Sequence, residues 1–371
     1  MIKNTEAAVL YETNSDLVVE NLNLAAPGPK EVFVQMGAAG VCHSDVHVIS
    51  GQANQIMPCV LGHEGAGLVT SIGKEVINVS VGDHVVLSWL PYCGKCYQCV
   101  RGKTHLCKAY QTPVGNGTLL DGSCRFSNLE GPVRQLGSLG CWSENVVVPE
   151  VCCVPVDKSI PFEIAALLGC AVTTGVGAVL NRAKVQNGET VVVIGAGGVG
   201  LSVVMAAKLI GASQVICIDQ NISARNLAIE LGATDFLVSK QNEDISKKLM
   251  ELTGVGADHV FEAVGKRELQ SDAIDYCCSG GTVTFVGLDS EDATINLKTT
   301  AITRAEKTIS GSIYGSACTH RDFALYGEKF LEGKLPIDLM VNRRYHLSEI
   351  NIALSDMLEG KPGRGVIVFD Q

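Results

Sequence analysis

Residues 190–219, TVVVIGAGGVGLSVVMAAKLIGASQVICID, decide the fold of this chain. The β-branched run at 191–194 predicts a buried strand, the glycines after it a turn, and the apolar residues that follow an amphipathic helix. A second apolar strand ends at Asp219, and a strand, a helix and a strand in this order form a right-handed βαβ unit. Further candidate strands continue the alternation, so we predict a parallel sheet with helices on both faces. These strands are FLVS (236–239), HVFEAV (259–264) and GTVTFVGL (281–288).

The glycine turn has the spacing of a dinucleotide-binding loop. Gly195 permits the tight turn, Gly197 lets the backbone approach a pyrophosphate, and Gly200 lets the helix pack close to the strand. Asp219 lies 19 residues after Gly200, where its carboxylate can bind an adenosine ribose and repel a 2′-phosphate. The alternative is a glycine-rich turn beside an unrelated surface aspartate. The combination favours NAD over NADP.

Composition restricts the class of protein. The chain has 371 residues, 46% of them hydrophobic, which is enough for two cored domains. A net charge of −10 argues against nucleic acid as a partner. We expect no signal peptide, because the N-terminus lacks an apolar core, and no membrane span, because no apolar run is long enough. Fifteen cysteines in so large a chain indicate reduced thiols and a cytoplasmic protein.

The first part of the chain has a different texture from residues 190–219. About 170 residues are rich in glycine and β-branched residues, as in EVFVQMGAAGVC (31–42), and predict short antiparallel strands in a barrel-like domain. The end of the chain, RGVIVFD (364–370), predicts a strand that rejoins this domain. We therefore expect one domain from 1–171 and 314–371 and a second from 172–313.

Two groups of residues indicate metal sites. The segment PYCGKCYQCVRGKTHLC (91–107) contains four cysteines, which suit a closed tetrahedral zinc site; a disulfide cluster, a redox motif and an iron–sulfur site are the alternatives. Cys42, His63 and Cys170 are dispersed and could each be an ordinary core residue. Together they offer two thiolates and an imidazole, a set that leaves a fourth zinc position free for substrate.

At this point the sequence resembles a known family. GHEGAGLVTSIGKEV (62–76) matches the zinc signature G-H-E-x2-G-x5-G-x2-V of the zinc-dependent medium-chain alcohol dehydrogenases at every fixed position. The other family motifs follow in the family's order, and the segment between Cys107 and Cys170 is similar to that of the dimeric class I/class III branch. These motifs are GVCHSDVHVISG (40–51), the four-cysteine segment, GTLLDGSCRFS (117–127), LLGCAVTTGVGA (167–178), GAGGVG (195–200) and SGSIYGS (310–316).

The resemblance implies a GroES-like catalytic barrel, with a structural-zinc lobe at about 91–108, and a Rossmann coenzyme domain. It also implies a role for each matching residue. The catalytic zinc would be held by Cys42, His63 and Cys170, and the structural zinc by Cys93, Cys96, Cys99 and Cys107. Asp45 and Glu64 match carboxylates beside the metal, and Ser44 and His47 match a proton relay. Coenzyme contacts fall on His43, Thr174, Gly195, Gly197, Gly198, Val199, Gly200, Asp219 and Arg364, with Arg225 standing in for a lysine whose position is Ala224 here. The inner substrate cleft maps to Trp89, Leu136, Leu288 and Ile313, with Ala53 and Thr112 towards its mouth.

The implied reaction interconverts a primary alcohol and its aldehyde with NAD. Zinc would act as a Lewis acid, Ser44 would pass the alcohol proton through the coenzyme ribose to His47, and hydride would move to the nicotinamide. The small-molecule alcohol or aldehyde would be the substrate, and the protein would be a homodimer.

Besides Ala224 at the coenzyme-contacting lysine position, two departures from the family bear on the substrate. Class III enzymes, which oxidise the glutathione adduct of formaldehyde, carry acidic residues where this chain has Ala53 and Gln55, and an arginine at the position of Gln111. A glutathione carboxylate would meet no cation here, so we expect this alternative activity to be poor. Trp89 is larger than the usual residue and should favour slender primary alcohols over secondary ones. The third hypothesis is a non-catalytic relative that binds a nucleotide. Such a protein could lose Cys42, Ser44 or His47, and the presence of all three argues against it.

Overall fold

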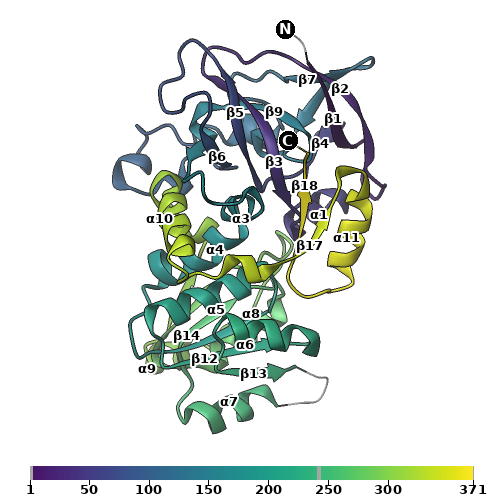
Figure 1. Ribbon diagram of the computed structural model, residues 1–371. Coiled ribbons are helices and arrows are strands. Elements are labelled where there is room, and N and C mark those ends of the chain that lie inside the picture. The colour runs from purple at the N-terminus through teal and green to yellow at the C-terminus, as the bar shows by residue number, and fades with distance from the viewer. Residues whose placement is uncertain (1–2, 240–243, 371) are drawn as a thin grey trace.

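The computed structural model describes residues 3–239 and 244–370 (Figure 1). Strands from the N-terminal part of the chain lie in the upper half of Figure 1 together with the C-terminal strands β17 and β18. The layered strands and helices between β11 and β16 lie in the lower half. Three sheets organise these residues, namely a closed barrel, a seven-stranded sheet and a six-stranded sheet.

The barrel closes in the order β1-β2-β7-β8-β4, with antiparallel neighbours except for the parallel pair β4 and β8. Fully buried side chains such as Leu10, Leu22 and Phe126 fill it. The prediction of a barrel of short, mainly antiparallel strands is confirmed. Its strands are β1 (Lys3–Leu10), β2 (Val18–Leu24), β4 (Cys59–Val60), β7 (Phe126–Asn128) and β8 (Gly131–Gln135).

The seven-stranded sheet joins the two ends of the chain. Its order is β10-β6-β5-β3-β18-β17, and β9 also pairs with β3. The strand expected at RGVIVFD is β18, which runs antiparallel to β3 with Val366 opposite Gly40. The strands are β3 (Glu31–Gly40), β5 (Gly65–Ile72), β6 (His84–Leu87), β9 (Asn145–Pro149), β10 (Cys153–Pro155), β17 (Val341–Tyr345) and β18 (Arg364–Val368).

The six-stranded sheet is parallel throughout, in the order β13-β12-β11-β14-β15-β16. Successive side chains of a strand point to opposite faces, and Val191 and Val193 accordingly pack in a different apolar cluster from Val192 and Ile194. Both faces are therefore covered, as the sequence predicts. The strands are β11 (Thr190–Ile194), β12 (Gln214–Asp219), β13 (Asp235–Val238), β14 (Ala257–Glu262), β15 (Cys277–Phe285) and β16 (Thr308–Gly311).

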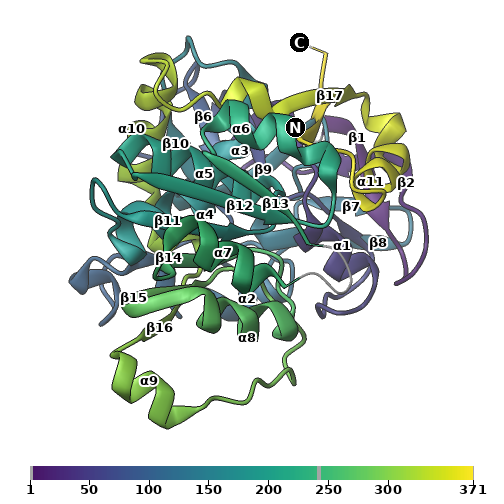
Figure 2. The ribbon, with the colours of Figure 1, turned by 90° about the horizontal axis from the view of Figure 1, so that it is seen from below.

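Helices α5 (Gly198–Ile210) and α6 (Arg225–Leu231) cover one face of this sheet, and α7 (Ile245–Thr253) and α8 (Arg267–Tyr276) cover the other (Figure 2). Helix α5 ends at Gly211, whose φ of +82° stops the helix. Helix α9 (Thr299–Ala305) differs from these four because it contributes no buried residue. Figure 2 shows it on an arm that projects from the edge of the sheet.

The remaining helices position the site. Gly37 lies so close to α3 that a Cβ there would come within 2.2 Å of the Phe162 ring, so glycine lets α3 pack on β3. Gly177 of α4 meets Gly315 in the same way, at the junction of the two expected domains. The boundaries of those domains stay a prediction. These helices are α1 (His43–Ile49), α2 (Gln111–Gly115), α3 (Phe162–Leu168), α4 (Ala171–Gly177), α10 (Thr319–Leu331) and α11 (Ile350–Leu358).

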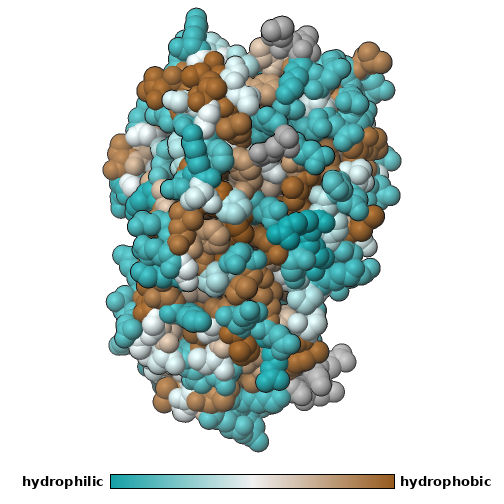
Figure 3. Space-filling view, viewed as in Figure 1, coloured by the Kyte–Doolittle hydropathy of each residue, from teal (hydrophilic) through white to brown (hydrophobic). Residues whose placement is uncertain are grey.

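Across the described residues, no single helix is long and apolar enough to cross a membrane. One helix pair, Phe162–Leu168 with Ala171–Ala183, has the length and composition of a span but is bent by 51°. Most residues of α3 and all residues of α4 are buried in the protein. The surface is mixed in polarity, with apolar residues gathered across the middle of the face in Figure 3.

Candidate active site and metal ligands

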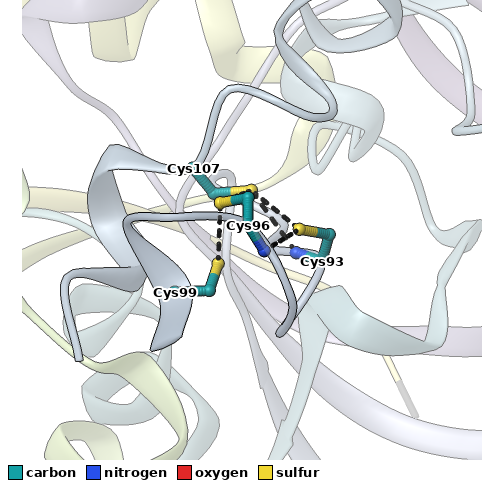
Figure 4. Close-up of side chains that lie close together, drawn as sticks. All are labelled: Cys93, Cys96, Cys99 and Cys107. Carbon is teal, nitrogen blue, oxygen red and sulfur yellow. Dashed lines mark hydrogen bonds between the residues drawn. The ribbon is translucent and has the colours of Figure 1, made fainter. Parts of the chain in front are cut away.

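The four cysteines of residues 91–107 lie in one loop between β6 and α2. Figure 4 shows their side chains converging, and all four sulfur atoms lie within 4.8 Å of one another. The Sγ atom of Cys96 is 3.5 Å from that of Cys99 and 3.8 Å from that of Cys107, which is 3.6 Å from Cys93. A disulfide needs about 2.05 Å, and each of these cysteines is a free thiol.

These separations fit a zinc ion. Four sulfurs bound at 2.3 Å to a tetrahedral zinc lie about 3.8 Å apart. Backbone amides also favour the thiolate form, since the N–H of Cys96 donates to Cys93 Sγ at 3.3 Å and that of Cys93 to Cys107 Sγ at 3.4 Å. Hydrogen bonds from the backbone at Cys99 and its neighbours lower the pKa of Cys96 to about 6. The loop, called the cysteine lobe below, therefore fits a structural zinc site.

A second cluster forms from three distant segments. Cys42 lies between β3 and α1, His63 between β4 and β5, and Cys170 between α3 and α4. The structure brings one donor atom of each, with a carboxylate oxygen of Glu64, to within 4.8 Å of one another. Glycines make this convergence possible: Gly62 has a φ of +87°, and a Cβ on it would collide with Trp142.

His63 is oriented by the buried carboxylate of Asp45. Its Nδ1 lies 3.1 Å from Asp45 Oδ1, which also accepts a hydrogen bond from the amide of Gly62. Nδ1 therefore carries a proton, which leaves Nε2 as the nitrogen whose lone pair could bind a metal ion. Nε2 is buried and has no hydrogen-bond partner among the described residues. A buried lone pair with no partner is costly, and a metal ion bound by Nε2 would satisfy it.

The thiols of Cys42 and Cys170 lie close together. The contact with Cys170 lowers the pKa of Cys42 against the effect of burial, and the positive charge of Arg364 acts in the same direction. The same contact, together with burial, raises the pKa of Cys170, so this thiol keeps its proton. A divalent cation would replace that proton, since zinc binds thiolates. The donor set fits zinc with two sulfurs and one nitrogen.

Glu64 lies behind this cluster and is paired with Arg364. Its Oε2 is 2.5 Å from Arg364 Nη2, and its Oε1 accepts the amide of Ala171 at 3.1 Å. Burial raises the pKa of Glu64 to about 7 although Arg364 opposes the shift. Arg364 also donates to the carbonyl of Val41, so this buried pair ties β18 to the loops that carry Cys42 and Cys170.

The glycine loop connects β11 to α5. Gly195 has a φ of +102°, and a Cβ on Gly200 would lie 1.8 Å from the Gly195 carbonyl oxygen, so glycine is needed at both positions. A Cβ on Gly197 would meet nothing within 4 Å. Open space therefore adjoins the first amides of α5, where a pyrophosphate would bind. Both oxygens of Asp219 accept amides, from Ala196 at 2.7 Å and from Asn221 at 2.8 Å.

Arg364 joins the metal cluster to the glycine loop. A Cβ on Gly198 would lie 2.4 Å from its Nη1, so the guanidinium borders the loop while Nη2 binds Glu64. Val199 lies close to α4, since a Cβ on Gly175 would lie 2.4 Å from its carbonyl oxygen, and Thr174 is the neighbouring residue on α4. By contrast, Arg225 is exposed at the start of α6 and does not supply the hydrogen bonds described for Asp219.

Helix α1 carries the expected relay. Ser44 Oγ lies 3.9 Å from Cys42 Sγ, and His47 follows three residues later on the same side of the helix. Ser44 is exposed and His47 half-buried. His43 is exposed on the same turn.

Of the residues expected to contact substrate, Trp89 lies beside the zinc-ligand cluster. Its ring lies edge-on to that of His63 with centroids 6.3 Å apart, and a Cβ on Gly137, next to Leu136, would lie 3.2 Å from Trp89 Cβ. Ile313 is 38% exposed and Leu288 63% exposed. Ala53 is half-buried and Thr112 exposed.

Sequence reasoning missed Tyr314, which lies against Trp89 with ring centroids 4.9 Å apart. Its hydroxyl donates to the carbonyl of Gly169, beside Cys170. It therefore supports both the cleft wall and a ligand-bearing turn. The only sequence signal for it is its position inside the family motif SGSIYGS. In the structure its φ is +52°, a left-handed backbone conformation.

Comparison with known proteins places the chain. The family model described as alcohol dehydrogenase GroES-like domain matches residues 28–158, and the model described as zinc-binding dehydrogenase matches residues 198–331. The first match covers the barrel strands β4, β7 and β8 and the cysteine lobe, and the second begins at Gly198 and covers five of the six strands of the parallel sheet, β12 to β16.

Individual relatives match nearly the whole chain. An S-(hydroxymethyl)glutathione dehydrogenase of Saccharomyces cerevisiae is 37% identical over 98% of this chain and 96% of its own length. An NDMA-dependent alcohol dehydrogenase of Amycolatopsis methanolica is 37% identical over 98% of both chains. The crystal structure of benzyl alcohol dehydrogenase from Acinetobacter calcoaceticus has a TM-score of 0.94 at 32% identity, covering 99% of this chain and 100% of that one. The chain is therefore an oxidoreductase that uses zinc and a nicotinamide coenzyme, and it belongs to the zinc-dependent medium-chain alcohol dehydrogenase family.

Proposed function

We propose that this protein interconverts a primary alcohol and its aldehyde with NAD⁺ and NADH. One observation carries the proposal. Cys42, His63 and Cys170 meet around an unpartnered His63 nitrogen, and Arg364 borders both this cluster and the glycine loop. A metal and a dinucleotide held there would lie on either side of one arginine.

The residues of the chain would divide the work. Zinc held by Cys42, His63 and Cys170 would supply a Lewis acid that favours the alkoxide form of the alcohol. Asp45 fixes the tautomer of His63 through Nδ1. Ser44 would accept the alcohol proton, and the half-buried His47, three residues later on the same side of α1, would release it towards solvent.

The coenzyme preference rests on Asp219. Its carboxylate stands at the end of β12, held by the amides of Ala196 and Asn221. A ribose diol can donate to it, whereas a 2′-phosphate would meet a fixed negative charge. We therefore propose NAD rather than NADP as the coenzyme.

The residues mapped to the cleft favour an uncharged substrate. Trp89, Leu136 and Ile313 are apolar, and an alcohol gains about 0.8 kcal/mol, or about fourfold in binding, for each CH₂ it buries. The second candidate is the glutathione adduct of formaldehyde, because several relatives are named for that activity. Ala53, Gln55 and Gln111 offer a glutathione carboxylate no positive charge.

A substrate panel separates the two candidates. With the zinc-loaded protein and NAD⁺, kcat/KM measured from NADH absorbance should rise along a series of primary alcohols. Secondary alcohols and S-hydroxymethylglutathione should both be poor. The Trp89→Ala variant should accept bulkier alcohols. Efficient turnover of the glutathione adduct by the wild type would instead establish the second candidate.

We further propose that the protein is a cytoplasmic homodimer. Among the described strands, β16 has β15 as its only sheet neighbour, so its other edge is open. The adjoining arm around α9 is exposed, with Leu297 44% accessible. A second copy of the chain could cover this open strand edge and the exposed apolar side chains beside it.

A further inference from the structure

We propose that Asn221 positions the coenzyme site by connecting the acid at the end of β12 to the loop that carries Arg364. This inference rests on the proposed function, because it concerns a dinucleotide that spans Asp219 and Arg364. It adds a positioning residue that the sequence motifs do not contain.

The connection begins at Asp219. Its Oδ1 accepts the backbone amide of Asn221 at 2.8 Å, and its Oδ2 accepts the amide of Ala196 in the glycine loop at 2.7 Å. The carboxylate is thereby fixed relative to both the glycine loop and residue 221.

The side chain of Asn221 then links the segment after β12 to the segment before β18. Its Nδ2 donates to the carbonyl oxygen of Gly360 at 2.7 Å, and its Oδ1 accepts the amide of Ser223 at 3.0 Å and the hydroxyl of Ser223 at 2.7 Å. Asn221 follows β12 in the six-stranded sheet, whereas Gly360 precedes β18 in the seven-stranded sheet. Gly360 has a φ of +74°, so its carbonyl is presented by a turn that favours glycine.

The loop at residues 359–363 is also held from its other side. Arg343 donates to the carbonyl oxygens of Pro362 at 2.8 Å and Lys361 at 3.2 Å, and Asn342 donates to Pro362. The loop leads directly into Arg364, whose guanidinium borders Gly198. Asn221 is therefore the side chain through which the position of Asp219 is transmitted to this loop.

The spacing between Asp219 and Arg364 matters for a ligand that contacts both. A dinucleotide would place its adenosine ribose at Asp219 and its pyrophosphate at the glycine loop beside Arg364. If the two contacts are held at a fixed distance before binding, less ordering is needed when the ligand binds. A smaller ligand that reaches only one contact gains nothing from that spacing.

The test compares Asn221→Ser with Ser223→Ala in zinc-loaded protein. Serine at 221 can still accept the amide of residue 223, but it has no N–H to reach Gly360. Ser223→Ala removes the hydroxyl contact to Asn221 and leaves the bond to Gly360, so it is the matched control. The affinity for NADH is measured by fluorescence titration and the affinity for adenosine by competition with NADH, with melting temperature as the check on folding.

We expect Asn221→Ser to weaken NADH binding by about three- to tenfold, the range for one hydrogen bond. Adenosine binding should change less, because adenosine has no phosphate to reach the glycine loop, and KM for NAD⁺ should rise without a fall in kcat. Ser223→Ala should match the wild type in each measurement.

Equal NADH affinity in the wild type and Asn221→Ser would overturn this inference while leaving the proposed function intact. Equal losses for NADH and adenosine would also overturn it, because the hydrogen bond from Asn221 to Gly360 would then affect only the ribose contact at Asp219. Wild-type protein that binds no NADH would refute the proposed function itself.

Discussion

His63 shows how much of the site is decided by single atoms. Its Nδ1–H donates a hydrogen bond to Asp45, and its buried Nε2 has no partner among the residues that the structure describes. Neither fact is visible in the sequence GHEG, although the motif predicts which residue is involved. The same holds for Glu64, since its pairing with Arg364, 300 residues away, depends on the register of β18 against β3.

Replacing a ligand of the dispersed cluster tests the metal assignment. Cys42→Ser should lower kcat/KM by about 10³-fold or more, since metal polarisation supplies several kcal/mol. The fold should be retained, and elemental analysis should find one zinc per chain instead of two. Cys278→Ser, outside both clusters, is the control and should keep both ions. Two ions in Cys42→Ser would contradict the assignment.

The coenzyme preference is tested at Asp219. Asp219→Gly removes both the ribose acceptor and the charge that faces a 2′-phosphate. The ratio of kcat/KM for NAD⁺ to that for NADP⁺ should fall by about tenfold or more, because a repulsion of roughly 1.4 kcal/mol between the carboxylate and the 2′-phosphate already accounts for a factor of ten. A wild-type protein that prefers NADP⁺ would show that Asp219 has been given the wrong role.

Among the elements, the cysteine lobe has no regular sheet and only two short 3-10 turns of its own. Its sulfurs are held by backbone amides and by one another. Such a loop has little core to stabilise it, so a bound ion would contribute directly to its folding.

Cys93→Ser should therefore act mainly on stability. Loss of a zinc held at 1,000 times its dissociation constant removes about 4 kcal/mol. The melting temperature should fall by several degrees, while residual activity at low temperature should exceed that of Cys42→Ser. The reverse ranking of the two variants would mean that the closed and the open site have been exchanged. Iron in place of zinc in the lobe would overturn its interpretation as a zinc site.

The elements differ in how far the sequence predicts them. The strand, loop and helix at 190–219 follow from local pattern, because apolar alternation and glycine spacing are properties of neighbouring residues. The strand at RGVIVFD is predicted too, since its β-branched run is local. By contrast, Tyr314 beside Trp89 and Asn221 beside Gly360 are contacts between elements far apart in the chain. Such contacts depend on how the sheets pack, which periodicity does not encode.

For the whole molecule, the open edge of β16 and the arm around α9 bear on assembly. The purified protein should have a solution mass twice the 39.2 kDa of one chain. Placing lysines on this surface, as in Leu297→Lys with Thr308→Lys, should shift light-scattering mass towards the monomer because like charges would face each other. Ile77→Lys, at an 86% exposed apolar residue of another loop, should leave the mass unchanged. A monomeric wild type would refute the dimer.

The place of β18 has a consequence for biosynthesis. Residues 38–40 of β3 pair with residues 366–368, and Glu64 receives its counter-charge from residue 364. Because N-terminal regions fold first as a chain leaves the ribosome, the edge of β3 that pairs with β18 stays open until translation is almost complete, while its other edge can pair with β5. A product released before residue 364 would keep this open strand edge and a buried acid without its counter-charge. Chaperones and proteases act on chains with such features. We therefore expect the active site to be complete only in chains that are synthesised to full length.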